Sequence, residues 1–428
     1  MNGRSTVPVA AVSGERDGWL AQAAATAVLL IVFLDLPNYL AALNDDFRPK
    51  QAYYLMLVVG LAVVGASRRF SLHSVRPAML FMIAVYALLN LMHATLLQHA
   101  PDSQAVHEAW FRIQIVVLGG VVALSASVLP TQYLGRVMAW CASIAAISVV
   151  IDFVVPHWFY PALADGAVPG RAGGIMISST RAGEVLIVCS LLALPALTPA
   201  RAMLLIALVG VGVLMTLSRG AMTIWLLFYL GLWANRTLPR SALGLLILTG
   251  LIVASSAGLL LAYLASTNPA SDIGDLAQRL GFLSGSVPTD DSAQERTMVL
   301  VDGLRLFADN PLFGAGVAAT SEWAHEVGTH NQLVMMAAEY GLLGALGWLG
   351  LIGFCLSGSY FAKPSNHWIA AAVVVLFSML THGMLDYPFW IAALMLLAIR
   401  RPAHEHEAAA IRPDPPARPD SGPSPSRG

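Results

Sequence analysis

The stretch EVGTHNQLVMMAAEYGLLGALGWLG, residues 326–350, joins a polar segment to a long apolar run. The run that follows Asn331 is about as long as the ~20 apolar residues that an α-helix needs to cross a bilayer. Thr329 and His330 stand directly before it. The stretch therefore predicts a membrane-spanning helix with a titratable side chain at its entrance.

The composition of the 428-residue chain favours the same class of protein. Hydrophobic residues make up 57% of the chain and charged residues 11%, whereas soluble domains have about 25% charged residues. Cys141, Cys189 and Cys355 lie within apolar runs and lack ligand spacing, so neither disulfides nor a metal site is expected. We expect an all-α polytopic membrane protein that needs no cofactor and binds membrane lipids but no nucleic acid.

Apolar runs along the chain give about 12 candidate transmembrane helices. They lie near residues 19–42, 51–66, 77–98, 109–129, 137–155, 182–198, 202–217, 220–235, 241–265, 331–357, 367–385 and 388–399. The first run follows Arg4 and Arg16 without a clear cleavage site, so we interpret it as a retained span and not a signal peptide.

The turns between these runs differ in charge. One set of turns, with both termini, holds 15 of the 24 Lys and Arg residues and includes SRRFSLHSVR (67–76) and NRTLPR (235–240). Most of the remaining 9 lie in the other set, which includes the segment around Arg171 and residues 266–330. Because cytoplasmic loops carry an excess of basic residues, we expect both termini to be cytoplasmic and the second set to face outward.

Four segments follow from this organisation. We expect N-terminal spans over 1–265, a large outer loop with amphipathic helices over 266–330, C-terminal spans over 331–399 and a disordered cytoplasmic tail over 400–428. In the loop, a capping box of Ser292 and Glu295 opens a helix whose apolar side is expected to rest on the membrane. Its apolar positions are Met298, Val299, Val301, Leu304, Leu306 and Phe307.

The unexpected polar residues gather on the outer side. They are Arg171, Arg219, Arg296, His330 with Asn331, and Asp386. Charges near membrane spans are costly, which favours a functional role for them as a set.

Each of these residues also has a structural explanation. An arginine at a helix end can extend to the membrane interface, as Arg219 would. Arg296 and Arg305 would be solvated, Asn331 would cap a helix, and Asp386 would mark a turn before Pro388.

Two motif matches are excluded by their spacing. In HEVGTH (325–330) the histidines are five residues apart and would lie on different faces of a helix, unlike those of the zinc motif H-E-x-x-H. GAG (314–316) follows a helix and not a strand, so it does not indicate a dinucleotide site. His404 and His406 in the tail are more simply solvated than metal ligands.

Several arginines and one histidine on the outer face suit a particular chemistry. The planar guanidinium group matches phosphate oxygens and needs no metal. Histidine, which titrates near neutral pH, suits a general base. Together these residues indicate transfer from a lipid-linked diphosphate, with arginines neutralising the leaving pyrophosphate.

Three motifs, in this order and on these spans, resemble the O-antigen ligase and polymerase superfamily. They are LMTLSRGA (214–221), ERTMVLVDGLRLFADNPLFGAG (295–316) and THNQLVMMAAEYGLLGALGWLG (329–350). RAGGIMISSTRAGE (171–184) resembles the arginine-bearing outer loop of the family, but Ser-Ser-Thr stands where an Asn-Pro-Asn-like run is frequent. The resemblance covers about residues 168–350, with His-Asn and AEYGLLG as its most specific part.

The resemblance implies a metal-independent, inverting glycosyltransferase of the GT-C type in the inner membrane of a Gram-negative bacterium. Such an O-antigen ligase transfers glycan from undecaprenyl diphosphate to the lipid A–core oligosaccharide at the periplasmic face, in lipopolysaccharide biosynthesis. Carried to this chain, Arg219 and Arg296 would bind the diphosphate, Arg171 would assist, and His330 would deprotonate the acceptor hydroxyl. Asn331 and Asp386 are expected to contact substrate.

Three alternatives remain open. An O-antigen polymerase or a protein O-oligosaccharyltransferase would use the same donor with another acceptor. A transporter or flippase for a polyprenyl-linked sugar would use the arginines to guide phosphate. Transporters frequently have inverted repeats and ionisable residues at mid-membrane, and we recognise no repeat in this sequence.

Overall fold

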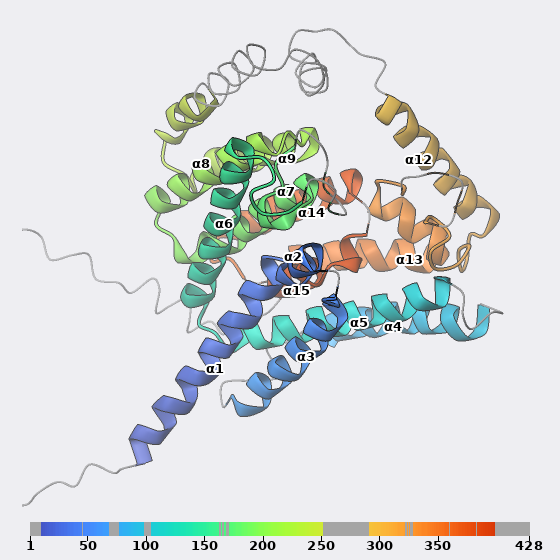
Figure 1. Ribbon diagram of the computed structural model, residues 1–428, viewed down its shortest axis with the longest axis horizontal. Coiled ribbons are helices and arrows are strands. Elements are labelled where there is room, and N and C mark those ends of the chain that lie inside the picture. The colour runs from blue at the N-terminus through green and yellow to red at the C-terminus, as the bar shows by residue number, and fades with distance from the viewer. Residues whose placement is uncertain are drawn as a thin grey trace, which may run out of the picture.

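A computed structural model describes residues 10–44, 46–67, 77–97, 104–161, 164, 167, 171–250, 291–321, 323, 325, 328–358, 360–381 and 383–398. The elements assigned in these residues are all helices (Figure 1). They are α1 (Ala10–Phe33), α2 (Leu36–Leu43), α3 (Pro49–Ala66), α4 (Pro77–Met92), η2 (His93–Leu97), α5 (Gln104–Ser127), α6 (Thr131–Val154), η3 (Gly174–Met176), α7 (Ser179–Ala193), η4 (Leu194–Ala196), α8 (Pro199–Met215), α9 (Arg219–Ala234), α12 (Asp291–Asp309), α13 (Gln332–Leu356), α14 (Pro364–Leu380), η6 (Met384–Asp386) and α15 (Pro388–Ala398).

Some sequence predictions lie outside the described residues. These are most of the candidate span 241–265, residues 266–290 of the outer loop, the side chain of Ser292 in the expected capping box, and the tail 400–428.

The membrane class predicted from the sequence is confirmed. In the described part of the chain, five helices are long and apolar enough to cross a membrane: Pro49–Ala66, Gln104–Ser127, Thr131–Val154, Ser179–Ala196 and Gln332–Cys355. The bent pair α1–α2 adds a sixth if it is one span. Shorter apolar helices occupy other predicted spans, namely Leu80–Thr95, Pro199–Met215, Pro364–Leu380 and Pro388–Ala398. The count of twelve stays a prediction.

Helix α15 forms the centre of the bundle. All its residues, from Pro388 to Ala398, are buried, and it packs against α5, α13, α7 and α1. A helix that is apolar on every side is stable only when other apolar surface surrounds it. The contact with α5 is close, because a Cβ on Gly119 would lie 2.6 Å from Ile391 Cβ.

The outer helices expose large apolar side chains. Trp19 of α1, Leu55 of α3 and Trp140 of α6 are each more than half exposed. Contiguous apolar surface of this kind is unfavourable in water and favourable against lipid. The buried α15 and these exposed side chains together give the bundle an apolar interior and an apolar outer surface, as a polytopic membrane protein needs.

The first predicted span, 19–42, is divided. Helices α1 and α2 meet at an angle of 59°, and Asp35 between them adopts a left-handed conformation with φ 50°. Pro37 in the first turn of α2 has no N–H to continue the α1 ladder. Asp35 is therefore placed inside the bundle, where it is 4% exposed.

Helix α13 is interrupted at Gly341, which has φ 66° and ψ −153°. The turn Asn310–Gly316 fits against this break. The N–H of Ala315 donates to the carbonyl of Ala338 at 2.7 Å, and the N–H of Leu342 donates to the carbonyl of Pro311 at 2.8 Å. The two sequence motifs NPLFGAG and AEYGLLG therefore satisfy each other's backbone groups.

Gly341→Ala should lower the stability of the protein by about 1–3 kcal/mol or more, because the backbone conformation of Gly341 is nearly restricted to glycine. The added Cβ would also lie 2.4 Å from the carbonyl carbon of Leu312. The measurement is the thermal midpoint in detergent. Gly353→Ala in the same helix is the matched control, because a Cβ there meets nothing within 4 Å. Equal thermal midpoints for the two variants would contradict the requirement for glycine at position 341.

Candidate functional site

The first turns of several helices meet at one end of the bundle. A Cβ on Gly183 of α7 would lie 2.5 Å from the Cβ of Ala221 in α9. The backbone N–H of Met384 in η6, just before α15, donates to Oε1 of Gln332 in α13 at 2.7 Å. Helix N-termini carry partial positive charge and unpaired N–H groups. This end of the bundle is therefore favourable for an anionic ligand.

His330 is the residue before the N-cap of α13. It is half-buried and has φ 47°, a left-handed conformation in which histidine is more frequent than most residues. Asn331 is the N-cap, since its Oδ1 accepts from the N–H of Val334 at 3.1 Å. The structural explanation of Asn331 is thus confirmed. Because Gln332 is held by Met384, the segments of His330 and Asp386 lie against each other.

Arg219 is the first residue of α9 and is exposed. Its neighbours hold the start of this helix between two others. A Cβ on Gly220 would lie 3.1 Å from Cδ1 of Leu380 at the end of α14, and Ala221 touches α7 at Gly183. The predicted break between two apolar runs is present, and it places Arg219 at the same end as η6 and His330.

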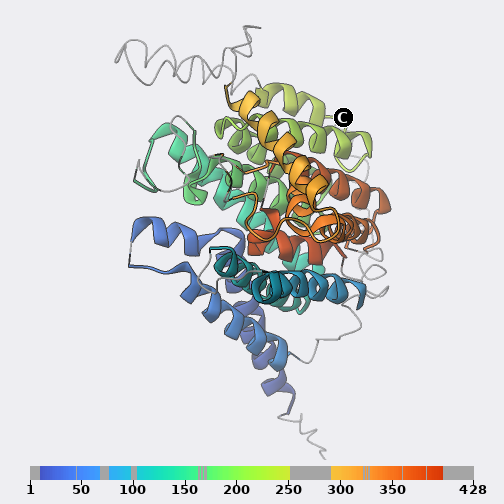
Figure 2. The same ribbon diagram turned by 90° about the vertical axis from the view of Figure 1, so that its right-hand side faces the viewer.

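Arg296 belongs to α12, which packs along the start of α13 (Figure 2). Gly303 makes this contact, because a Cβ there would lie 2.8 Å from Val334 Cγ1 and 3.1 Å from Thr329 Cγ2. Arg296 lies two turns before Gly303 on the same helix face. It is exposed, and it continues the face that contacts the residue next to His330.

Arg305 lies on the solvated side of α12, as its structural explanation requires. Its side chain is 73% exposed and pairs with Asp302 at 2.8 Å. His325 Nε2 lies 2.8 Å from the other oxygen of Asp302, and this hydrogen bond, aided by Arg305, lowers the pKa of Asp302.

The apolar residues of α12 are divided between a buried and an exposed face, and the expectation that this helix rests on the membrane stays a prediction. Val299 is buried, whereas Met298, Val301 and Leu304 are 47%, 41% and 48% exposed. The face that bears Val299 is covered by α13, and the other three side chains stay open to the surroundings.

The loop that carries Arg171 is anchored to α6 by a buried carboxylate. Asp152 is 3% exposed, and its Oδ2 accepts from the N–H of Gly173 at 2.9 Å and of Gly174 at 3.0 Å. Gly174 has φ 57°, and a Cβ there would lie 2.4 Å from Ser148 Oγ. The glycines of the RAGG motif are thus required by this contact, and Arg171 stands half-buried before them.

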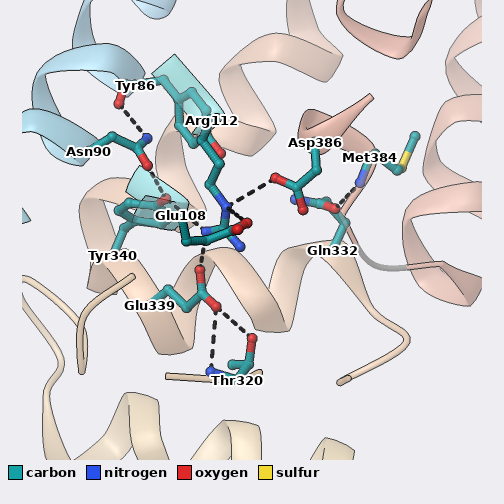
Figure 3. A network of polar contacts seen from close by, with 10 residues as sticks. All are labelled: Tyr86, Asn90, Glu108, Arg112, Thr320, Gln332, Glu339, Tyr340, Met384 and Asp386. Atoms are coloured by element: carbon teal, nitrogen blue, oxygen red, sulfur yellow. Dashed lines mark hydrogen bonds and ion pairs between the residues drawn. The ribbon is translucent and has the colours of Figure 1, made fainter. Parts of the chain in front are cut away.

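Asp386 pairs with Arg112, a buried arginine of α5 (Figure 3). The Asp386 carboxylate lies 3.0 Å from Arg112 Nε, and Glu108 lies 3.1 Å from the same atom. Glu339 of α13 binds Arg112 Nη1. Burial raises the pKa of the Asp386 carboxyl to about 7, against the opposing effect of Arg112. Asp386 therefore belongs to an ion cluster and does not only mark a turn.

Glu339 extends this cluster to the outer segment of the chain. It is fully buried, and its Oε1 accepts from Thr320 Oγ1 at 2.6 Å. The next residue, Tyr340, receives a hydrogen bond from Arg112 at 3.0 Å and donates one to Asn90 Oδ1 at 2.8 Å. Helices α4, α5 and α13, η6 and the residues before α13 are all joined through Arg112.

A cavity of about 550 Å³ lies beside Asp386. Its walls come from α2, α3, α5, the segment 176–178, Arg181 and Tyr387. Arg181 donates to Asp35 Oδ2 at 2.7 Å and to the Tyr387 hydroxyl at 2.8 Å, and its guanidinium lies 4.4 Å from the centre of the Tyr387 ring. The loop of Arg171 and the segment of Asp386 therefore border one cavity.

Arg112, Glu339 and Asp35 were not among the site residues predicted from the sequence. Each is a charged residue inside an apolar run, where charge is costly unless it is paired, so the sequence did indicate that they have partners. Their pairing is not visible in the sequence, since Arg112 and Glu339 are 227 positions apart.

The arrangement can bind an anion and accept a proton at one end of the bundle. Arg219 at the start of α9 and Arg296 in α12 are exposed. Arg112 and Arg181 are buried or half-buried and are paired with carboxylates. Within the described ranges, no three His, Cys, Asp or Glu side chains are grouped so as to hold a metal ion.

Comparison with known proteins identifies part of the chain. The family model described as O-antigen ligase matches residues 202–349, a range that includes Arg219, Arg296, His330 and Asn331. No curated protein gave a significant match. The resemblance inferred from the sequence motifs is confirmed over this range, in which the chain is similar to the O-antigen ligase family.

Proposed function

We propose that this protein is an O-antigen ligase of lipopolysaccharide biosynthesis. It transfers glycan from undecaprenyl diphosphate to the lipid A–core oligosaccharide at the periplasmic face of a Gram-negative inner membrane. It is an inverting glycosyltransferase of the GT-C type, independent of metal. One observation carries the proposal: the O-antigen ligase match spans Arg219, Arg296 and His330, and the helix that bears Arg296 packs against the start of α13 beside His330.

Transfer needs a nucleophile, a leaving group and a proton acceptor. The acceptor hydroxyl oxygen attacks the anomeric carbon, the bond from that carbon to the diphosphate oxygen breaks, and undecaprenyl diphosphate leaves with the electron pair. Arg219 and Arg296, with the N-terminus of α9, bind the diphosphate and stabilise its developing charge. His330 takes the proton of the hydroxyl.

The remaining candidate residues have supporting roles in this proposal. Arg171 assists in binding the donor, and Asn331 and Asp386 contact substrate. Asn331 also caps α13 through Val334, so its substitution would alter helix stability as well as binding.

The direct test is a reaction with purified components. The protein, a lipid-linked glycan and rough lipopolysaccharide are combined in the presence of a chelator, and a covalent glycan–lipopolysaccharide product is expected. Chain extension on a lipid-linked glycan would instead identify a polymerase, and product on a protein acceptor would identify an O-oligosaccharyltransferase. Movement of the donor across a vesicle without covalent product would favour a flippase.

The proposed topology has twelve spans, both termini in the cytoplasm, and residues 266–330 in the periplasm as a separate loop before the C-terminal spans. A reporter fused after Ser286 should then report a periplasmic position, and one fused after Arg240 a cytoplasmic one. The measurement is alkaline phosphatase activity against green fluorescence for each fusion. The inverted pattern would place His330 on the cytoplasmic side and exclude the ligase function.

Arg219→Ala and Arg296→Ala should each reduce turnover by about one to two decades. The loss of one charge-assisted contact to phosphate corresponds to about 1.5–3 kcal/mol, expressed in the rate if the contact acts in the transition state. Lysine at either position should restore activity only in part, since it retains the charge but not the planar fork. Initial rates at equal protein concentration measure both effects.

Arg305→Ala is the matched control, because Arg305 lies on the same helix as Arg296 and faces solvent. Its turnover should remain near that of the unmodified protein. If Arg219→Ala and Arg296→Ala were both fully active, the diphosphate role would be rejected.

His330→Gln should reduce turnover by about 10²–10⁴-fold, the usual contribution of a general base, while binding of the donor stays nearly unchanged. His330→Gly separates loss of the imidazole from backbone strain, because glycine accepts the left-handed backbone at this position. Near-normal turnover of His330→Gln at matched membrane abundance would end the general-base proposal.

A further inference from the structure

We propose that the 550 Å³ cavity beside Asp386 binds the sugar chain of the acceptor. This inference rests on the proposed ligase function and deepens it by giving the second substrate a place of its own. The cavity is lined by α2, α3, α5, the segment 176–178 that follows the Arg171 loop, Arg181, and η6 with Tyr387. Its volume is in the usual range of binding sites for small molecules.

The chemistry of the walls fits a polyhydroxylated ligand. Tyr53, Phe111 and Tyr387 supply aromatic surface, and Asn38 and Asp386 supply an amide and a carboxylate. Sugars present apolar C–H faces and many hydroxyl groups, so they need both kinds of partner. The polar groups are held in place: Asn38 donates to the Tyr53 hydroxyl at 3.1 Å, and Asp386 is fixed by Arg112 at 3.0 Å.

The two guanidinium groups beside the cavity do not favour the diphosphate of the donor, because both are already paired. Arg181 is paired with Asp35 at 2.7 Å, and Arg112 is shared among the carboxylates of Glu108, Glu339 and Asp386. These two guanidinium groups thus face four carboxylates and offer no excess positive charge to a phosphate. A neutral saccharide segment does not require an excess of positive charge in order to bind.

The cavity adjoins the proposed donor site, because Arg181 lines it and Gly183, two residues later in α7, contacts Ala221 of α9. Helices α3 and α5, which also line the cavity, lie on the other side of α13 and α15 from α9 and α12 (Figures 1 and 2). Gln332 and Met384 bridge the two sides at 2.7 Å, and each is two residues from a proposed site residue, His330 and Asp386. An acceptor hydroxyl leaving the cavity past Asp386 would therefore arrive at the segment of His330.

The cavity wall also contains a strained residue. Ile177 has φ 61° and ψ −58°, an unfavourable conformation for a β-branched side chain. Such strain is found at ligand-binding segments, where surrounding contacts maintain it. It is maintained here by the anchorage of Gly173 and Gly174 to Asp152.

The experiment fills the cavity from α2. Ala42 lines it, whereas the next residue, Leu43, does not and is 49% exposed. Initial rates of Ala42→Trp are measured against acceptor concentration at saturating donor, and against donor concentration at saturating acceptor. We expect the KM for rough lipopolysaccharide to rise at least about tenfold and the KM for the donor to stay unchanged. Leu43→Trp should leave both constants unchanged.

A second measurement does not require turnover, and its substitution at Ala42 is smaller than tryptophan. Ala42→Cys in detergent is treated with a maleimide, with and without core oligosaccharide released from rough lipopolysaccharide. The oligosaccharide should protect Cys introduced at Ala42 and should not protect Cys introduced at Leu43, and undecaprenyl diphosphate should protect neither. The native cysteines Cys141, Cys189 and Cys355 are buried and give a low background.

The outcomes separate the two proposals. Protection without any ligation product would support the cavity inference and reject the ligase function. A ligation product with an unchanged acceptor KM in Ala42→Trp and no protection of Ala42→Cys would overturn the cavity inference alone. A rise in the donor KM, or protection by the donor glycan instead of the core oligosaccharide, would also overturn it.

Discussion

The guanidinium group of Arg112 is buried between α5, α13 and η6, where it binds carboxylates from all three. A guanidinium that is only 1% exposed cannot remain among apolar helices without partners, and removing one partner of a buried pair costs about 3–5 kcal/mol. The carboxylates that satisfy it come from Glu108 on its own helix, Glu339 on α13 and Asp386 in η6. One side chain therefore fixes three segments relative to one another.

The interrupted part of α13 is linked to the same ion cluster through Glu339. Glu339 uses one oxygen for Arg112 and the other for Thr320, and its backbone carbonyl accepts from the N–H of Gly316 at 3.2 Å. The segment 310–320 is thereby attached to α13 on both its backbone and its side chains. Helix α12, which precedes this segment, is consequently held against Thr329 and Val334 at the start of α13.

Two kinds of arginine result from this arrangement. Arg112 and Arg181 form ion pairs with carboxylates and thereby join helices of the bundle. Arg219 and Arg296 are exposed. In the proposed mechanism the exposed pair meets the diphosphate, and the paired arginines shape a cavity for the uncharged sugar chain.

The class of the protein, most helix positions and the O-antigen ligase motifs could be predicted from the sequence alone, because apolar run length and local motif spacing are properties of short segments. Asn331 as a cap and the break before Arg219 were predictable for the same reason. The division of α13 at Gly341, the bend at Asp35 and the pairing of Arg112 with Glu339 were decided only by the tertiary structure. These features depend on residues far apart in the chain, brought together because buried charges and interrupted backbones must find partners that no local pattern specifies.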